Sequence, residues 1–207
     1  MAGFAVVDVE TTGLNPSSDR IIEIDVVALD AEGEFEDEWT SLVNPLRPVA
    51  AQFVHGISDD DVAGAPTFTE LLPHIATRLE GRAIAAHNAA FDVGFLNASF
   101  KRARFPMEVP LDATVCTMEL SKIYLPEGRH GLVSASERAG ITLSQHHRAL
   151  ADAWTAAQLL RVYLRAEEQG RRYLERATSR TGRVTSPASW IEAQLCARSL
   201  TWPVALF

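Results

Sequence analysis

The pattern of apolar and polar positions predicts a group of strands at the start of the chain. Residues 4–9 (FAVVDV) form a valine-rich apolar run that is typical of a central strand. Residues 20–30 and 35–43 predict two more strands, separated by a short turn at 31–34. Because the connections are short, we expect the three strands to pair as an antiparallel meander.

Farther along the chain the apolar spacing becomes helical. Thr67 and Glu70 form a capping box that predicts the start of a helix running to about residue 80. Residues 82–87 predict a short buried strand, and 89–104 the helix that follows it. Further helices are predicted at 113–123, 132–139 and 149–169. This order indicates an α/β fold of the ribonuclease H-like type, in which a mixed sheet of meander and parallel strands is flanked by helices.

The composition changes near residue 170. Residues 1–170 have the length of one domain. Residues 171–207 begin with basic and turn-forming residues and then become apolar again. We expect this tail either to pack back on the domain or to dock on a partner through Trp190, Leu195, Leu200, Trp202 and Phe207.

The net charge of −8 hides an uneven distribution along the chain. Residues 1–70 hold 15 acidic and 2 basic residues, so the remainder carries an excess of positive charge. The basic candidates for contact with a polyanion are Lys101, Arg102, Arg104, Arg171, Arg172, Arg176, Arg180 and Arg183, although solvated helix faces would also explain them. The sequence contains no apolar run of ~20 residues and no signal peptide, so we expect a cytoplasmic protein without membrane contact.

Four acidic residues lie where predicted strands or loops meet helices. Asp8 and Glu10 are two residues apart on an apolar strand, so both carboxylates project from one face. Such acids are costly to bury without a cation, and Mg²⁺ or Mn²⁺ prefers oxygen ligands. Asp92 and Asp152 lie in the first turns of two predicted helices, where the helix dipole alone would favour an acid. The recurrence of these acids at one kind of position indicates a metal site.

A histidine accompanies the last acid. His147 lies five residues before Asp152, in the predicted loop that leads into the long helix. The unperturbed imidazole pKa of about 6.5 suits a general base at neutral pH. His146 is the alternative candidate for this role.

Together these motifs resemble those of the DEDDh exonucleases, the DnaQ-like family that includes the proofreading epsilon subunit of bacterial DNA polymerase III. The matching segments are DVETTG (8–13), HGI (55–57), HNAAFDVGFL (87–96) and HRALADA (147–153), and the resemblance covers roughly residues 4–165. The sister subgroup has a tyrosine four residues before the last acid. That position is Arg148 here, which indicates the histidine subgroup.

The resemblance implies an activity and a set of site residues. It implies an exonuclease domain at 1–170 that uses two Mg²⁺ or Mn²⁺ ions to release nucleoside 5′-monophosphates from single-stranded or frayed DNA 3′ ends. Asp8, Glu10 and Asp152 would ligate the ions, Asp92 would assist directly or through water, and His147 would be the base. The terminal nucleotide would be bound by Thr11, Thr12, Gly13, Leu14, His55, Ile57 and Phe91.

Two alternatives remain open at this point. The same five catalytic residues occur in the oligoribonuclease and RNase T branches, so RNA is an alternative substrate. A non-catalytic module that binds nucleic acid or a polymerase subunit is the other alternative, although the acids and His147 are all present.

Overall fold

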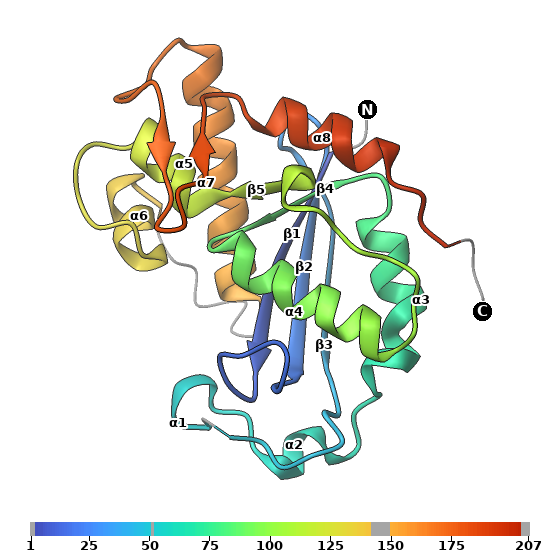
Figure 1. Cartoon of the computed structure of the whole chain (residues 1–207). Helices are drawn as coiled ribbons and strands as arrows, with labels where there is room; N and C mark the ends of the chain where they lie inside the picture. Colours follow the sequence, from blue (N-terminus) through green and yellow to red (C-terminus); the bar gives the residue numbers. More distant parts are fainter. Residues whose placement is uncertain (1–2, 51, 142–149, 204–207) are drawn as a thin grey trace.

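A five-stranded mixed sheet organises the chain in the computed structural model, which describes residues 3–50, 52–141 and 150–203 (Figure 1). The strands lie in the order β3-β2-β1-β4-β5, with antiparallel pairing from β3 to β1 and parallel pairing from β1 to β5. Their bounds are β1 Phe4–Thr11, β2 Ile21–Leu29, β3 Phe35–Leu42, β4 Ala83–Ala86 and β5 Thr114–Cys116. The predicted ribonuclease H-like sheet, with its meander and parallel strands, is confirmed.

The fifth strand was not predicted. A helix was expected over 113–123, but the chain first forms a 3-10 turn, η1 (Leu111–Ala113), and then β5. Helix α5 begins only at Thr117 and ends at Tyr124. The expectation was wrong for 113–116 because β5 is three residues long, too short for a periodic pattern. Its strand conformation depends on pairing with β4.

The other predicted helices are present, and the one after Thr67 starts with the predicted capping box. The hydroxyl of Thr67 accepts the backbone N–H of Glu70, whose carboxylate accepts the backbone N–H of Thr67 at 2.7 Å. This capping box starts α3 at Phe68. The described helices besides α5 are α1 Gln52–His55, α2 Asp59–Ala63, α3 Phe68–Leu79, α4 Ala89–Arg102, α6 Leu132–Arg138, α7 Ala151–Glu168 and α8 Trp190–Ser199.

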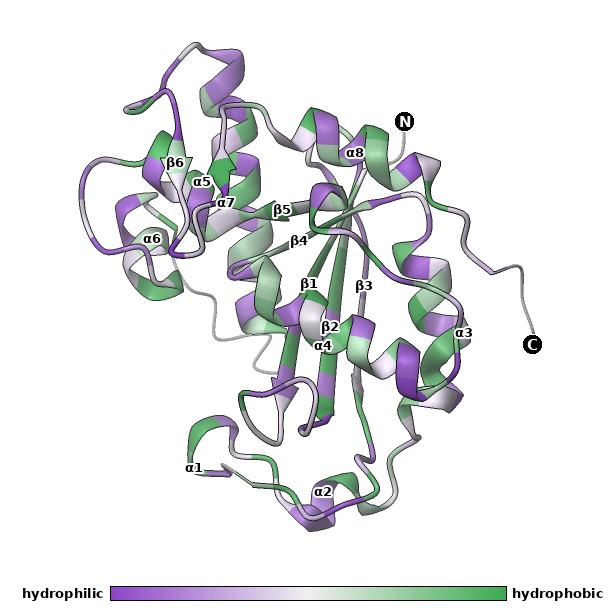
Figure 2. Cartoon of the chain, in the orientation of Figure 1, coloured by the Kyte–Doolittle hydropathy of each residue, from purple (hydrophilic) through white to green (hydrophobic). Residues whose placement is uncertain are grey.

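Hydrophobic burial holds the central strands in place. Val6, Val7 and Ile24 are fully buried between the sheet and its helices. In Figure 2 the central strands are hydrophobic over most of their length, and hydrophilic bands interrupt β1 and β2 toward one end. The strands are therefore rigidly packed up to the point where their polar residues begin.

The C-terminal segment packs on the same core. It forms a small hairpin of β6 (Ala177–Thr178) and β7 (Val184–Thr185), followed by α8. Trp190 and Trp202 are buried, and the Trp202 ring lies 6.1 Å from that of Phe100. Leu195, on the same helix as Trp190, is 60% exposed, and Leu200 is half-buried. Phe207 lies outside the described residues, and no helix within them has the length and apolar character to cross a membrane.

Trp202→Ala should lower the stability of the whole domain. Removing this buried indole leaves a cavity beside Phe100 and Phe105, which typically costs about 3–5 kcal/mol. For a chain of this size we expect a melting temperature lower by roughly 10 °C. Leu195→Ala is the control, because an exposed position should change stability by no more than about 0.5 kcal/mol. Equal melting temperatures for the two variants would show that the tail does not contribute to the core.

Candidate active site

Four carboxylates lie side by side where β1 and β2 become polar. Asp8 is paired across the strands with Asp25, and Glu10 with Glu23. Directly opposed residues project from the same face of a sheet with side chains about 5 Å apart. The sequence prediction included Asp8 and Glu10 but missed Glu23 and Asp25. The two-residue spacing in the strand RIIEID was the available indication.

Burial and mutual repulsion make these acids weak. Burial, reinforced by the charges of Asp152, Glu10 and Glu23, raises the pKa of Asp8 to about 7. Burial raises the pKa of Asp25 to about 8, although a hydrogen bond with Thr40 acts in the opposite direction. The pKa of Glu23 is raised to about 7 by burial and by the charge of Glu10. Each negative charge on this face is therefore costly near neutral pH.

Two helices bring the remaining predicted acids to this face. Asp92 is buried in the first turn of α4, and burial followed by the charge of Asp8 raises its pKa well above the ordinary value. Asp152 lies in the first turn of α7 and is exposed. Desolvation raises its pKa, and its charge raises the pKa of both Asp8 and Glu10. These couplings indicate that β1, α4 and α7 deliver their acids to one region.

The donor set fits hard divalent cations. All the groups are carboxylates, and a cation among them would offset the burial and the mutual repulsion that make their negative charges costly. Within the described part of the chain, Oδ1 of Asp25 is buried without a hydrogen-bond partner. No three acidic, histidine or cysteine side chains of the described residues are gathered closely enough to hold one ion by themselves. The acids thus face one another without forming a closed cage. His146 and His147 lie outside the described residues.

The loop after β1 is held by its own polar groups. The Thr11 hydroxyl donates to the carbonyl of Gly13 at 2.7 Å, and the Thr12 hydroxyl accepts the backbone N–H of Arg20 at 3.1 Å. A Cβ at Gly13 would lie 2.5 Å from Oδ2 of Asp19, so a larger residue would displace the carboxylate that accepts the backbone N–H of Asn15 at 2.9 Å. Leu14 is 85% exposed at the tip of the loop. The two threonines therefore shape the loop, and Leu14 is the side chain it presents.

The other predicted contact residues differ in accessibility. His55 lies near Glu10, since a charge on its imidazole lowers the pKa of Glu10 against the larger effect of burial. Ile57 is buried in a small cluster with Ile22 and Val62. Phe91 is half-buried on α4, with its ring 4.9 Å from that of Phe95. Of the three, His55 is the one that the structure relates directly to the acids.

A mixed sheet with acids at the end of its central strand and in the first turns of two helices is the arrangement of a DnaQ-like exonuclease. The chain belongs to the exonuclease family, since the RNase T family model matches residues 5–160. The predicted family membership is confirmed.

The relatives and structural neighbours agree with this assignment. The PolC-type DNA polymerase III of Bacillus subtilis is 34% identical over 183 residues, which are 86% of this chain and 13% of that protein. The chain thus spans about an eighth of the length of this relative. Escherichia coli exonuclease I in complex with a dT13 oligonucleotide is similar in fold (TM-score 0.68, 17% identity, 81% of this chain and 42% of that one). Exonuclease X in complex with 5′-overhanging duplex DNA is also similar (TM-score 0.60, 26% identity, 81% and 93%).

Asp25→Asn should remove part of the pH dependence of stability when EDTA is present. A carboxyl whose folded-state pKa is raised to about 8 loses stability as pH rises from its ordinary pKa, about 4, toward 8. The neutral amide avoids this loss, so we expect the variant to gain about 1–3 kcal/mol over wild type at pH 8 and little at pH 4. Urea unfolding at a series of pH values measures the difference. Glu127→Gln, on an exposed loop, is the control, and a pH profile of Asp25→Asn parallel to wild type would contradict the prediction.

Proposed function

We propose that this chain is a 3′–5′ exonuclease that releases nucleoside 5′-monophosphates from DNA 3′ ends by two-metal hydrolysis. The observation that carries the proposal is the electrostatic coupling of acids from β1, α4 and α7 at one end of the central strand. The match to PolC-type DNA polymerase III favours DNA as the substrate and proofreading or repair in the cytoplasm as the setting. A DNA polymerase subunit is accordingly the candidate partner. We assign the exonuclease domain to residues 1–170 and treat 171–207 as an extension of it.

Asp8, Glu10 and Asp152 would hold two Mg²⁺ or Mn²⁺ ions, with Asp92 assisting directly or through water. When bound, such ions lower the pKa of an attacking water and stabilise the charge on the leaving 3′ oxygen. The four carboxylates are suited to this task because the strand and the two helices that carry them pack on one core. Their raised pKa values mean that protons compete with cations for the site at low pH.

His147 would accept the proton of the attacking water, since a neutral imidazole is available as a base near pH 7. The loop from Thr11 to Leu14 would receive the terminal nucleotide. The backbone N–H groups of Gly13 and Leu14 would face the sugar and phosphate, since that of Thr12 donates to the carbonyl of Arg20, and the exposed Leu14 would contact the base. His55, whose charge lowers the pKa of Glu10 against the larger effect of burial, would contact the same nucleotide. Apolar contacts of this kind tolerate any base.

Asp8→Asn should abolish both catalysis and cation binding. We expect mononucleotide release from single-stranded DNA to fall by roughly a thousandfold, because the lost stabilisation amounts to several kcal/mol. Wild type should also melt at a higher temperature in Mn²⁺ than in EDTA, and the variant should not. Release of mononucleotides at the wild-type rate by Asp8→Asn would refute the site.

His147→Ala is the companion variant, because it separates proton transfer from ion binding. We expect kcat to fall by about 100- to 10,000-fold while the Mn²⁺-dependent rise in melting temperature is kept. Loss of that rise would assign His147 to the ion site instead of to the base.

Matched DNA and RNA oligonucleotides test the choice of substrate. We expect wild type to degrade single-stranded DNA with the larger kcat/KM and to lose all activity in EDTA. A larger kcat/KM on RNA would place the chain with the exoribonucleases. A flat calorimetric titration with Mg²⁺ and Mn²⁺, together with no hydrolysis of either polymer, would revive the non-catalytic module.

A further inference from the structure

A cavity of about 1130 Å³ reaches the start of α4, the helix that carries Asp92. Asn88, Ala89 and Ala90 line it at the start of α4, and Asp92 follows in the same turn. The opposite side is formed by α5, by the β6–β7 hairpin and by the beginning of α8. The volume slightly exceeds the ~300–1,000 Å³ typical of ligand sites, so it has room for more than a single nucleotide.

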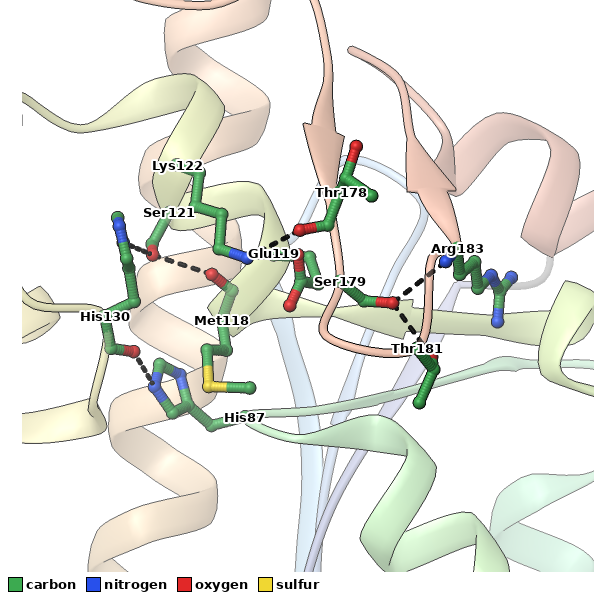
Figure 3. A network of polar contacts seen from close by, with 10 residues as sticks. All are labelled: His87, Met118, Glu119, Ser121, Lys122, His130, Thr178, Ser179, Thr181 and Arg183. Atoms are coloured by element: carbon green, nitrogen blue, oxygen red, sulfur yellow. Dashed lines mark hydrogen bonds and ion pairs between the residues drawn. The ribbon is translucent and has the colours of Figure 1, made fainter.

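The C-terminal extension supplies one wall of this cavity. Ser179, Arg180, Thr181 and Arg183 of the hairpin line it, and all lie beyond the residues that the family model matches. Figure 3 shows Ser179, Thr181 and Arg183 across from Glu119 and Lys122 of α5. One wall of the cavity therefore comes from residues outside the segment that the family model matches.

Hydrogen bonds hold the hairpin in position. The ammonium of Lys122 donates to the carbonyl of Thr178 at 3.1 Å, and the Arg183 guanidinium donates to the carbonyl of Leu111 at 2.6 Å. Within the hairpin, the backbone N–H of Arg183 donates to the Ser179 hydroxyl at 3.0 Å (Figure 3). These bonds connect the hairpin to α5 and η1, so its position beside the cavity is defined.

Two of the described arginines that line the cavity are free to bind an anion. Lys122 is paired with Glu119 at 2.7 Å, and Arg183 lies 3.4 Å from Asp112. Among the residues that the structure describes, the exposed side chains of Arg129 and Arg180 have no ion-pair partner. Glu192 is the other carboxylate of the lining. Unpaired guanidinium groups beside hydroxyls are suited to phosphodiester oxygens, which they bind with charge-assisted hydrogen bonds.

The position of the cavity indicates which part of a substrate would reach it. In Figure 1 the loop after β1 and the β6–β7 hairpin lie on opposite sides of the start of α4. A strand whose terminal nucleotide occupies the loop, with its scissile phosphate at the acids, would leave past the start of α4. The next nucleotides in the 5′ direction would then meet the cavity.

We propose that this cavity, which we call the upstream subsite, binds the sugar-phosphate backbone of the substrate strand on the 5′ side of the scissile bond. Arg129 and Arg180 are its phosphate ligands, and the subsite makes the C-terminal extension part of the substrate-binding surface. This inference rests on the proposed function, since it concerns the same substrate and the same catalytic site.

The double variant Arg129→Ala/Arg180→Ala tests the upstream subsite. Each arginine should matter only when the substrate has phosphates beyond the scissile one. We expect KM for a long single-stranded oligothymidylate to rise at least roughly tenfold, with kcat little changed. The slope of log KM against log salt should fall by about 1.4, since each contact to a single strand contributes ~0.7. Hydrolysis of the p-nitrophenyl ester of thymidine 5′-monophosphate, which has no upstream phosphate, should be unchanged.

The matched control is Arg165→Ala/Arg198→Ala, which removes the same charge from two exposed positions outside the cavity. This variant should keep the KM and salt slope of wild type. An equal loss in both double variants, or no change in Arg129→Ala/Arg180→Ala, would overturn the subsite. Failure of wild type to hydrolyse the ester would instead refute the proposed function itself, so the two failures are distinguishable.

Discussion

The repulsion among partly buried carboxylates on β1 and β2 is the constraint on which the site depends. A carboxylate that has lost water and faces other negative charges is unstable, and each unit of raised pKa corresponds to about 1.4 kcal/mol. The raised pKa values of Asp8, Glu23 and Asp25 record this cost. The apolar core can hold the acids in place because the residues around them on both strands are fully buried. Stability elsewhere thus offsets a local arrangement that is unfavourable without a cation.

The helix N-termini offset part of the cost of the acids that they supply. Asp92 and Asp152 each lie in the first turn of a helix, where the partial positive charge of the helix terminus favours a carboxylate. This position would favour an acid even without a metal site. It also lowers the cost of keeping the acid charged beside the other carboxylates. Helices α4 and α7 also pack on the buried strands, so their first turns are held at a fixed position relative to β1. The fold therefore supplies both rigidity and electrostatic compensation.

The C-terminal extension connects stability with the substrate-binding surface. Trp190 and Trp202 are part of the core. Between α7 and α8 the chain forms the β6–β7 hairpin, which lines one side of the upstream subsite. The basic residues of this segment balance the strongly acidic first third of the chain. A protein that gathers acids for cations needs positive charge elsewhere if it is to hold a polyanion. Here that charge lies beside the catalytic face, at the hairpin and the loop that contains Arg129.

The sequence by itself determined the elements and residues whose information is local. Apolar runs rich in β-branched residues predict β1 and β2, and a capping box predicts α3. Period-two spacing places Asp8 and Glu10 on one face, because it depends only on neighbours in the chain. The tertiary structure decided whatever depends on pairing between distant segments. Strand β5 exists because β4 lies beside it, and Glu23 and Asp25 join the acids because the strand register sets them opposite Glu10 and Asp8. The cavity likewise arises only when residues far apart in sequence, such as Asn88 and Arg180, are brought to one place by packing.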